Sequence, residues 1–438
     1  MIGYRSYRSY VDSGLEWLGT VPSHWRLIKN KYIFTEKKET VGENSGEYIL
    51  LSLTLHGIIP RDMENPSGKF PAEFNTYKIV NPNDIVFCLF DIEETPRTVG
   101  HSSHSGMITG AYTVIECNDT VLSRYIYYYH LYLDIDKRLG SLYTGLRKVI
   151  TRSNFFNIKT PLPPLPEQRA IADFLDSKTA QIEALIKKKQ RQLELLQEHR
   201  TTLINQAITK GLNPDAPMKD SGIEWLGEVP AYWRIARIKH ISLNMISGPF
   251  GSSLTKDMYT KNGFRVYGQE QVIPADFTIG DYYISEQKYL EMQRYAVSPS
   301  DVLISCVGTF GKIAVVPNDV EPGIINPRLI KVSPNRNLVA PNYLGEALSS
   351  KLIFEQLERV SRGGTMGVIN LGLLSEILIP LPPLDEQEEI LSFLKNKKTE
   401  NKITQRNIDN QASLLNEYRT ALISAAVTGK IDVRAEGS

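Results

Sequence analysis

The sequence of 438 residues contains little cysteine and no long apolar run. Its cysteines, Cys88, Cys117 and Cys306, are odd in number and far apart, so they indicate neither a disulfide framework nor a zinc site. No stretch of 18 apolar residues could span a membrane, and the first residues lack the apolar core of a signal peptide. We therefore expect a cytoplasmic protein.

An excess of charge of one sign is also missing. The 50 Lys and Arg residues nearly balance the 49 Asp and Glu residues, which leaves a net charge of +1 at pH 7. Because free-standing DNA-binding domains are often clearly basic, any nucleic-acid contact must come from local patches or be shared with partners. The length and the hydrophobic content of 42% allow sizeable cores in two to four domains.

The sequence lacks the loops that carry methyl transfer or nucleotide hydrolysis. An adenine methyltransferase needs a Pro-Pro-aromatic loop for the flipped base, but leucine follows both Pro-Pro pairs here, at 163–164 and 382–383. The segment 308–313 has neither the spacing nor the Ser or Thr of a phosphate-binding loop. His101 and His104 have no acidic or cysteine partner at metal-ligand spacing. We therefore expect a non-catalytic chain that binds no metal or cofactor.

What the chain does contain is an internal repeat. Residues 12–26 read DSGLEWLGTVPSHWR and residues 220–234 read DSGIEWLGEVPAYWR, identical at 11 of 15 positions. The segment PLPPLPEQRAIADFL at 161–175 returns as PLPPLDEQEEILSFL at 380–394, and LLQEHRTTLINQAIT at 195–209 returns as LLNEYRTALISAAVT at 414–428. Such a chain has two related halves and presents two related surfaces, for which duplex DNA is the obvious partner.

Between the repeated segments lie two variable regions, at about 27–160 and 235–379. A weaker repeat, VNPNDIV at 80–86 and VSPSDVL at 297–303, indicates that the regions share a fold. Short β-type runs at 84–90, 112–116, 301–307 and 312–316 are separated by Gly, Pro and Asn. We expect two similar mixed α+β domains, each built on a strongly twisted sheet.

Each proline-rich PLPPL segment is followed by a long helical pattern, at 167–209 and 386–428. Positions at alternating spacings of four and three run from Ile182 to Ala207 and from Asn401 to Ala426, which predicts an antiparallel coiled coil with polar positions at Arg200 and Arg419. The predicted seam includes Ile186, Leu193, Leu196, Arg200, Leu203, Ile408, Leu415, Arg419 and Leu422. The alternative is that each helix packs separately on its own domain.

These patterns divide the chain into four segments. Residues 1–164 and 212–383 form the two α+β domains, 165–211 the first long helix, and 384–438 the second helix and a tail. Because the halves are equivalent, we expect pseudo-twofold symmetry. The four tryptophans, Trp17, Trp25, Trp225 and Trp233, all lie in the repeated blocks. Side chains kept in both halves favour a structural role over base stacking.

The DSGxEWLGxVPxxWR block, the PLPPLxEQ entry into a long helix and the duplicated layout together resemble the specificity subunits of type I restriction-modification systems, over nearly the whole chain. The resemblance implies two target-recognition domains, each reading half of a split, asymmetric DNA site. The seam from Ile182 to Ala207 spans about 38 Å, close to the 34 to 36 Å of one DNA turn. The helices could therefore act as a ruler between the two readers.

Candidate DNA contacts come from loops with hydroxyls, amides and cations. In the second variable region they are Ser247, Phe250, Ser252, Ser253 and Lys256 in a glycine-containing loop, followed by Arg265, Tyr267, Gln269 and Gln271 along a predicted strand and its exit. In the first they are Lys69, then Arg97, Thr98, His101, Ser102 and His104 in a polar loop. Two equivalent loops before the PLPPL segments offer Arg147 and Lys148, and Arg362 and Thr365, for phosphate contact.

The resemblance also implies the partners. The chain would bind double-stranded DNA, recruit two modification (methyltransferase) subunits and associate with restriction subunits, and S-adenosylmethionine, ATP and Mg²⁺ would bind to those partners. The alternative is a stand-alone sequence-specific DNA-binding regulator, which tight, specific binding by the isolated chain would favour. The bases read and the spacing between half-sites do not follow from the sequence.

Overall fold

The computed structural model describes residues 4–62, 73–306, 311–361 and 370–434, with side chains described up to residue 356 in the third of these ranges. The chain forms two compact units, one of residues 1–190 and 409–438 and the other of residues 191–408. We call them unit 1 and unit 2. The predicted boundaries after residues 164 and 383 coincide with the first residues of the long helices, whereas each compact unit contains part of both helices.

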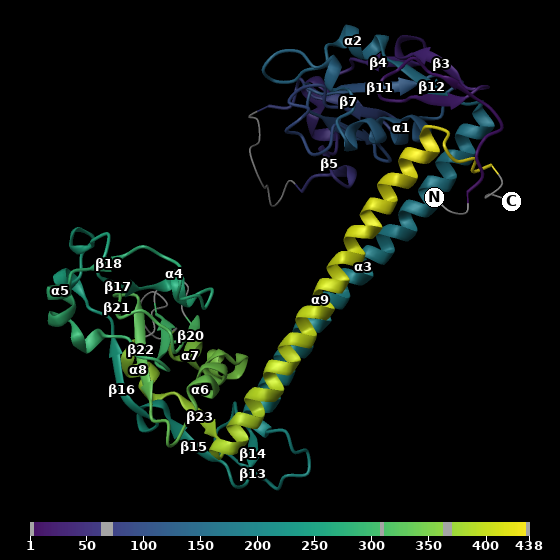
Figure 1. Ribbon diagram of the computed structural model, residues 1–438. Coiled ribbons are helices and arrows are strands. Elements are labelled where there is room, and N and C mark those ends of the chain that lie inside the picture. Colours follow the sequence, from purple (N-terminus) through teal and green to yellow (C-terminus); the bar gives the residue numbers. More distant parts are fainter. Residues whose placement is uncertain (1–3, 63–72, 307–310, 362–369, 435–438) are drawn as a thin grey trace. The chain divides into compact units, whose positions relative to one another are not determined.

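Unit 1 is built on an antiparallel sheet with the strand order β4 (Phe34–Lys37), β11 (Thr113–Cys117), β8 (Ile85–Phe87) and β9 (Val99–His101). Further antiparallel pairs are β1 (Tyr10–Asp12) with β2 (Thr20–Pro22), β3 (Arg26–Lys29) with β12 (Lys159–Leu162), β5 (Leu51–Thr54) with β6 (Gly57–Pro60), and β7 (Lys78–Val80) with β10 (Gly106–Ile108). Its shorter helices are α1 (Ser123–Ile135) and α2 (Arg152–Asn157) (Figure 1).

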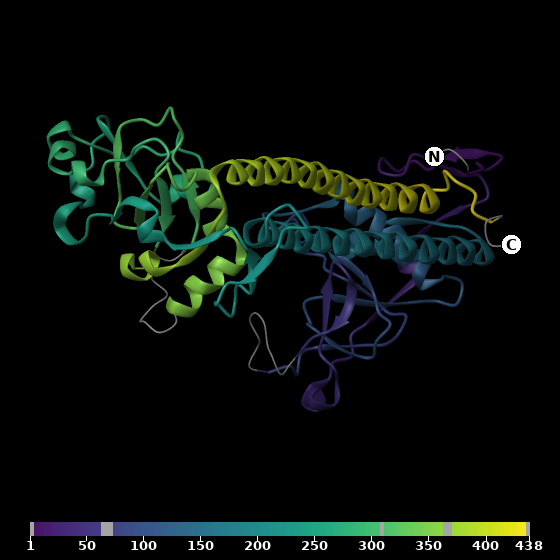
Figure 2. The ribbon, with the colours of Figure 1, turned by 90° about the horizontal axis from the view of Figure 1, so that it is seen from below.

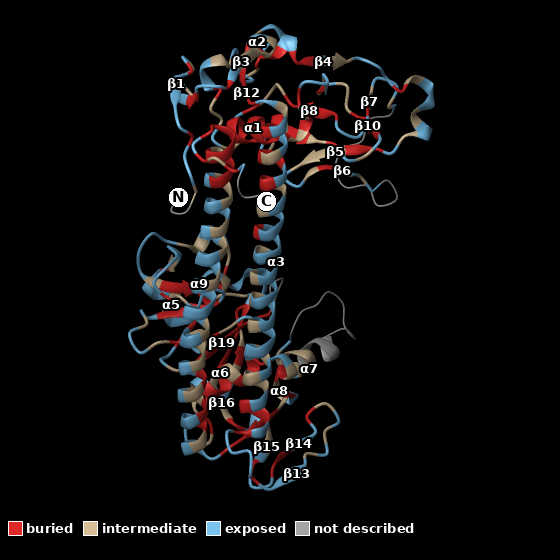
Figure 3. Ribbon diagram, turned by 90° about the vertical axis from the view of Figure 1, so that its right-hand side faces the viewer, coloured by how far each residue is buried: buried red, intermediate tan, exposed pale blue. Residues whose placement is uncertain are grey.

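The core of unit 1 lies between α1 and the sheet. Tyr125, Ile126 and Tyr129 of α1 are buried against strand residues such as Ile85 and Ile115. Figure 3 shows this burial as red on α1 and the strands, whereas much of the surface of the long helices is exposed. The alternating and β-branched runs thus place one apolar face against one helix, which is the usual way to cover an antiparallel sheet.

Unit 2 repeats this plan. Its main sheet has the order β16 (Ser242–Ser247), β22 (Leu329–Pro334), β19 (Val302–Ser305) and β20 (Ile313–Val315). The pairs β13 (Met218–Asp220) with β14 (Glu228–Pro230) and β15 (Arg234–Arg237) with β23 (Leu378–Leu381) match β1 with β2 and β3 with β12. A second sheet consists of β18 (Tyr283–Ile284), β17 (Phe264–Tyr267) and β21 (Gly323–Ile325). The shorter helices are α4 (Gln269–Val272), α5 (Glu286–Glu291), α6 (Pro341–Ser349), α7 (Lys351–Ser361) and α8 (Leu371–Glu376).

The weaker sequence repeat marks the same turn in both units. The carboxylate of Asp84 accepts a hydrogen bond from the backbone N–H of Asn81 at 2.7 Å, and that of Asp301 accepts one from Ser298 at 2.8 Å. Each turn leads into an inner strand of the main sheet, β8 or β19. The strands predicted from the β-type runs are confirmed as β8, β11, β19 and β20, each with slightly shorter or shifted bounds.

The two long helices are α3 (Leu165–Lys210) and α9 (Leu384–Val427), which confirms the predicted helical segments to within about two residues. In unit 1 the first part of α3 lies beside the last part of α9 in both views (Figures 1 and 2). There Ile171 and Leu175 share a core with Leu422 and Ala426. In unit 2 the last part of α3 packs on the first part of α9, and Ala207 and Ile208 share a core with Ile390 and Leu394. The two helices run antiparallel within each unit.

The predicted seam positions are more buried than most of their neighbours. Ile182 and Leu422 are buried, and the seam positions Ile186, Leu193, Leu196, Leu203, Ile408 and Leu415 are half-buried. The two predicted polar positions differ from each other: half-buried Arg419 lies 3.7 Å from the Glu183 carboxylate in unit 1, whereas Arg200 in unit 2 is exposed. Within the described residues, no helix is long and apolar enough to cross a membrane.

Candidate nucleic-acid interface

In both units, a hydrogen bond joins two of the repeated sequence segments. In unit 1 the Trp25 Nε1–H donates to Glu167 at 2.9 Å, and in unit 2 the Trp233 Nε1–H donates to Glu386 at the same distance. Each tryptophan belongs to the DSGxEWLGxVPxxWR block, and each glutamate to the first turn of a long helix. Burial of Trp25 and Trp233 agrees with the predicted structural role of these side chains. A buried indole N–H needs an acceptor, which explains the Glu of the PLPPLxEQ motif.

The glutamine of that motif has an equally regular role. Gln168 Oε1 accepts the backbone N–H of Leu122, and Gln387 Oε1 accepts that of Ala340, both at 2.8 Å. Each side-chain amide also donates at 2.9 Å to a carbonyl oxygen of the preceding Pro-Pro pair, at Pro163 or Pro382. The glutamine therefore joins the start of a long helix to the start of the domain helix α1 or α6.

Each buried tryptophan also contacts the end of the other long helix. A Cβ atom added to Gly429, just after α9, would lie 3.2 Å from the Trp25 ring, and one added to Gly211, just after α3, would lie 3.1 Å from the Trp233 ring. Both glycines have φ near +70°, which disfavours other residues. We call each tryptophan, with its glutamate and glycine, a clamp. Each clamp joins the start of one long helix to the end of the other within one unit.

Unit 2 contains an open hollow of about 430 Å³ that is lined by two of the predicted DNA contacts, Lys256 and Gln269. Lys256, Gln269 and Arg328 line it, together with Tyr259 and Tyr282, among other residues. Its lining combines two cations and one carboxylate, that of Glu270, with an amide that can read a base edge and aromatic rings that can contact sugars or bases. This hollow is the strongest candidate DNA-reading surface of unit 2.

Gln269 is held in place within this hollow. Its Nε2 donates to Ser305 Oγ at 2.6 Å, and its Oε1 lies 3.5 Å from an Arg328 Nη1. Ser305 is the last residue of the buried strand β19, so it fixes the amide on a rigid element. Arg328, which is exposed and follows Asn326-Pro327, was not among the predicted contacts. Arg328 contacts Gln269 across 59 positions of the chain, so only the tertiary structure brings the two residues together. In the sequence, Arg328 is only a cation that follows a turn.

The predicted base contacts at Arg265, Tyr267 and Gln271 are wrong. Arg265 is 4% exposed, and its guanidinium binds the Glu321 carboxylate at 2.6 Å and the carbonyl oxygens of the 278–280 segment. Tyr267 is fully buried, and Gln271 is 1% exposed because its side chain caps the start of α4. The expected strand ends at Tyr267 and a helix begins at Gln269, so the assumed alternation of outward-facing side chains stops there.

The other predicted contacts in the described part of unit 2 lie at the end of β16 and in the segment that follows it. Phe250 is 68% exposed, and Ser252 and Ser253 are exposed in a short 3-10 helix at Gly251–Ser253. Ser247 is half-buried at the end of β16. Phe250 and the two exposed serines stay candidate contacts, because an exposed aromatic ring beside hydroxyl groups can contact a nucleic-acid backbone or groove.

In unit 1 the segment 97–104 is not the open loop that was predicted. Val99–His101 forms strand β9, and Thr98 is buried with its N–H and hydroxyl donating to the Asp134 carboxylate. Ser102 is fully buried and donates to the carbonyl oxygen of His104 at 2.8 Å. Thr98 and Ser102 are therefore structural, and their prediction as DNA contacts is wrong.

The other predicted contacts of this segment, Arg97, His101 and His104, are half-buried. Arg97 lies 3.4 Å from Asp134, and His101 shares a 3.0 Å hydrogen bond with Ser123. Burial lowers the pKa of His101 below its ordinary value, so its ring is neutral at pH 7 and offers no positive charge to phosphate. His104 is half-buried beside exposed Ser103. Arg97 and His104 stay predicted contacts.

The predicted basic loop of unit 1, which contains Arg147 and Lys148, is exposed, but both cations have acidic partners. Arg147 donates through Nε to Asp91 at 2.9 Å and through Nη2 to the other oxygen of the same carboxylate, which lowers the pKa of Asp91. Lys148 lies 3.9 Å from Glu93. The fully exposed Leu146 lies between Gly145 and Arg147 and was not among the predicted contacts. A phosphate contact by Arg147 would have to compete with Asp91. Lys69, Arg362 and Thr365 lie outside the described residues.

The described residues contain no group of three or more His, Cys, Asp or Glu side chains placed to hold a metal ion. The clusters that the structure does bring together are the two clamps, the hollow of unit 2 and the paired basic loop of unit 1. None of these arrangements places a nucleophile beside a general base. Their chemistry is that of binding and positioning.

Comparison with known proteins agrees with this description. The family model of the type I restriction modification DNA specificity domain matches residues 106–195 and 250–413. The chain is 23% identical over 428 residues to the specificity subunit of the type I restriction enzyme MjaVIII of Methanocaldococcus jannaschii, covering 94% of each chain. It is also 23% identical over 276 residues to the EcoBI specificity subunit of Escherichia coli, covering 62% of this chain and 58% of that one.

Solved structures share the fold. A chain from a structure that describes complex assembly and conformational transition of the type I restriction-modification system matches with a TM-score of 0.67 at 16% identity, over 93% of this chain and 98% of that one. The HsdS subunit of Thermoanaerobacter tengcongensis matches with a TM-score of 0.57 at 17% identity, over 96% and 100%. Because the family model covers more than half of its residues, the chain belongs to the type I restriction modification DNA specificity family.

Proposed function

We propose that this chain is the DNA-recognition and scaffold subunit of a type I restriction-modification complex. Each unit carries one target-recognition domain, which reads one half of a bipartite, asymmetric DNA site. Helices α3 and α9 form an antiparallel coiled coil that relates the two domains by a pseudo-twofold axis and fixes the number of unread base pairs between the half-sites. The relatives named as specificity subunits of type I restriction enzymes support this assignment.

The observation that carries the proposal is the contrast between the repeated clamps and the unlike surfaces. Trp25 with Glu167 and Trp233 with Glu386 have the same geometry in both units. By contrast, unit 2 has the three-stranded sheet of β18, β17 and β21 beside the Gln269 hollow, whereas unit 1 has the two-stranded pairs β5 with β6 and β7 with β10 at the corresponding places in the chain order. Two units that share the same clamps but differ in their candidate DNA-binding surfaces could each recognise a different half-site of one duplex.

Catalysis in this proposal belongs to partner subunits. Two modification subunits supply S-adenosylmethionine and the base-flipping active sites, and restriction subunits supply ATP- and Mg²⁺-dependent cleavage. The absence from the sequence of a Pro-Pro-aromatic loop supports this division. The net charge of +1 also fits a chain that shares DNA binding with its partners.

The test is methylome sequencing of cells that express the modification partner with and without this chain. We expect methylation at one split, asymmetric motif only when both proteins are present, and none from the purified chain with DNA and S-adenosylmethionine. Methyl transfer by the chain alone would contradict the proposal. Tight, specific DNA binding by the isolated chain, without any dependence of methylation on it, would favour a stand-alone regulator.

A further inference from the structure

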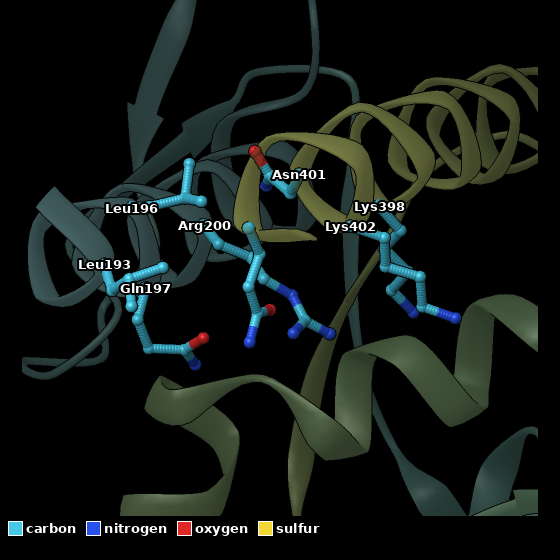
Figure 4. A pocket seen from close by; sticks show the side chains of 8 residues that line it. Leu193, Leu196, Gln197, Arg200, Lys398, Asn401 and Lys402 are labelled. Atoms are coloured by element: carbon cyan, nitrogen blue, oxygen red, sulfur yellow. The ribbon is translucent and has the colours of Figure 1, made fainter. Parts of the chain in front are cut away.

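A small hollow of about 160 Å³ interrupts the packing of α3 against α9 within unit 2 (Figure 4). The residues that line it are Leu193, Leu196, Gln197, Arg200, Lys398, Asn401, Lys402 and Gln405. Three of them are cations, three are amides, and none is acidic. Figure 4 shows the charged ends of Arg200, Lys398 and Lys402 on the same side of the two helices.

Three of the six polar residues of this hollow occupy positions where a helix pair normally packs apolar side chains. Arg200, Asn401 and Gln405 all fall on the spacing of four and three that defines the seam. The Asn401 Nδ2 atom is buried and has no hydrogen-bond partner in the part of the chain that the structure describes. A buried donor without an acceptor is destabilising, so an acceptor placed here would stabilise the helix pair.

The internal repeat provides a direct comparison, because positions on the two long helices correspond at an offset of 219 residues (419 − 200 = 219). In unit 1 the residue equivalent to Arg200 is Arg419, which pairs with Glu183 at 3.7 Å. The position equivalent to Glu183 is 183 + 219 = 402, and unit 2 has Lys402 there. Where unit 1 has an ion pair, unit 2 therefore has two cations.

The neighbouring positions change in the same direction. Thr179, Ile182 and Ile186 of unit 1 correspond to Lys398, Asn401 and Gln405 of unit 2. Unit 2 thus carries an added positive charge and two amides in place of a hydroxyl and two apolar side chains. Lys398 forms an ion pair with Glu346, but neither Arg200 nor Lys402 has an ion-pair partner within the described residues. The cationic character is therefore specific to unit 2 and not a general property of the helix pair.

We propose that this hollow is a phosphate-binding site. A phosphate group presents several oxygens, which match the Arg200 guanidinium, the Lys402 ammonium and the Asn401 amide as donors. Arg200 and Lys402 are exposed, so the site is open to a phosphate that is either free or part of a DNA backbone. Phosphate would replace the carboxylate that Glu183 supplies in unit 1.

The test uses the full-length protein in phosphate-free buffer, titrated with inorganic phosphate by calorimetry. Lys402→Glu introduces the residue of unit 1 and gives Arg200 an acidic partner, so the variant should fold with an unchanged or higher Tm. We expect it to bind phosphate at least about tenfold more weakly, the order expected for lost charge-assisted hydrogen bonds. Asn401→Ile should also weaken binding without lowering Tm, because Ile182 is its counterpart.

The control is Lys430→Glu, which makes the same charge change at an exposed residue outside the hollow. A second arm measures the affinity for duplex DNA that lacks the methylated motif, and only this arm rests on the proposed function. If Lys402→Glu weakens duplex binding and its salt dependence more than the control does, the phosphate belongs to the DNA backbone. If only phosphate binding is lost, the ligand is free phosphate. If wild-type protein binds no phosphate, or Lys402→Glu binds it as well as wild type, the site does not exist.

Discussion

Removing the acceptor of one clamp tests how strongly the repeated segments hold each other. In unit 2, Glu386 accepts from Trp233 Nε1 at 2.9 Å and from the Tyr232 hydroxyl at 3.1 Å. Glu386→Ala leaves the indole N–H of the fully buried Trp233 without its charged acceptor. We therefore expect the substitution to destabilise unit 2, although it lies far in sequence from the repeated block that it anchors.

The size of the effect follows from the burial. A hydrogen bond to a charged group contributes about 1.5 to 3 kcal/mol, and the lost contact is of this kind. Unit 2 spans residues 191–408, which is 218 residues (408 − 191 + 1), so each kcal/mol lowers Tm by about 2 to 4 °C. Glu386→Ala should therefore lower Tm by roughly 3 to 12 °C. Glu386→Gln keeps an acceptor but loses its charge, and should cost about 1 kcal/mol.

Calorimetric unfolding of Glu386→Ala, Trp233→Phe and the double variant measures the contact itself. If Trp233 and Glu386 interact as the structure indicates, their effects should be non-additive by at least about 0.5 kcal/mol. Glu388→Ala, at an exposed position of the same helical turn, is the control and should change stability by no more than about 0.5 kcal/mol. Additive effects of the two clamp substitutions would refute the role assigned to this hydrogen bond.

Three further predictions concern reading, spacing and pH. Gln269→Ala should remove roughly 1 to 3 kcal/mol of discrimination between bases at one position of one half-site, so methylome sequencing should show that position relaxed. Gln287→Ala, on the exposed face of α5, should leave the motif unchanged. Inserting four residues after Leu193, with a matched insertion after Ala412, adds about 6 Å of helix, and the unread gap should grow by about one or two base pairs with both half-sites unchanged. An unchanged gap would mean that the helices do not set the spacing. Burial lowers the pKa of His130 to about 3, so the neutral ring is favoured in the folded state. Unit 1 should lose stability as pH falls below about 6.5, and His130→Phe should flatten that slope in urea unfolding.

The sequence alone predicted the elements that depend on local patterns. The proline-rich segments followed by uninterrupted helix formers located α3 and α9, and the β-branched runs located strands of both main sheets. The repeat also showed which residues belong to the shared frame, because side chains kept in both halves, such as Trp25 and Trp233, are indeed buried. The helices and strands follow from patterns within a few residues, and the structural role of the tryptophans follows from the internal repeat.

Only the tertiary structure decided which polar residues face solvent. In the sequence, Arg265 and Thr98 cannot be distinguished from exposed DNA contacts. In the structure each is buried against a partner that is distant in the chain: Glu321 lies 56 positions from Arg265, and Asp134 lies 36 positions from Thr98. Arg328 joins Gln269 in the same way, across 59 positions. A polar side chain has no local periodicity that reveals its partner, so its burial depends on how the chain folds back on itself. That is why the sequence predicted the frame of this protein well, whereas the composition of its binding surfaces required the structure.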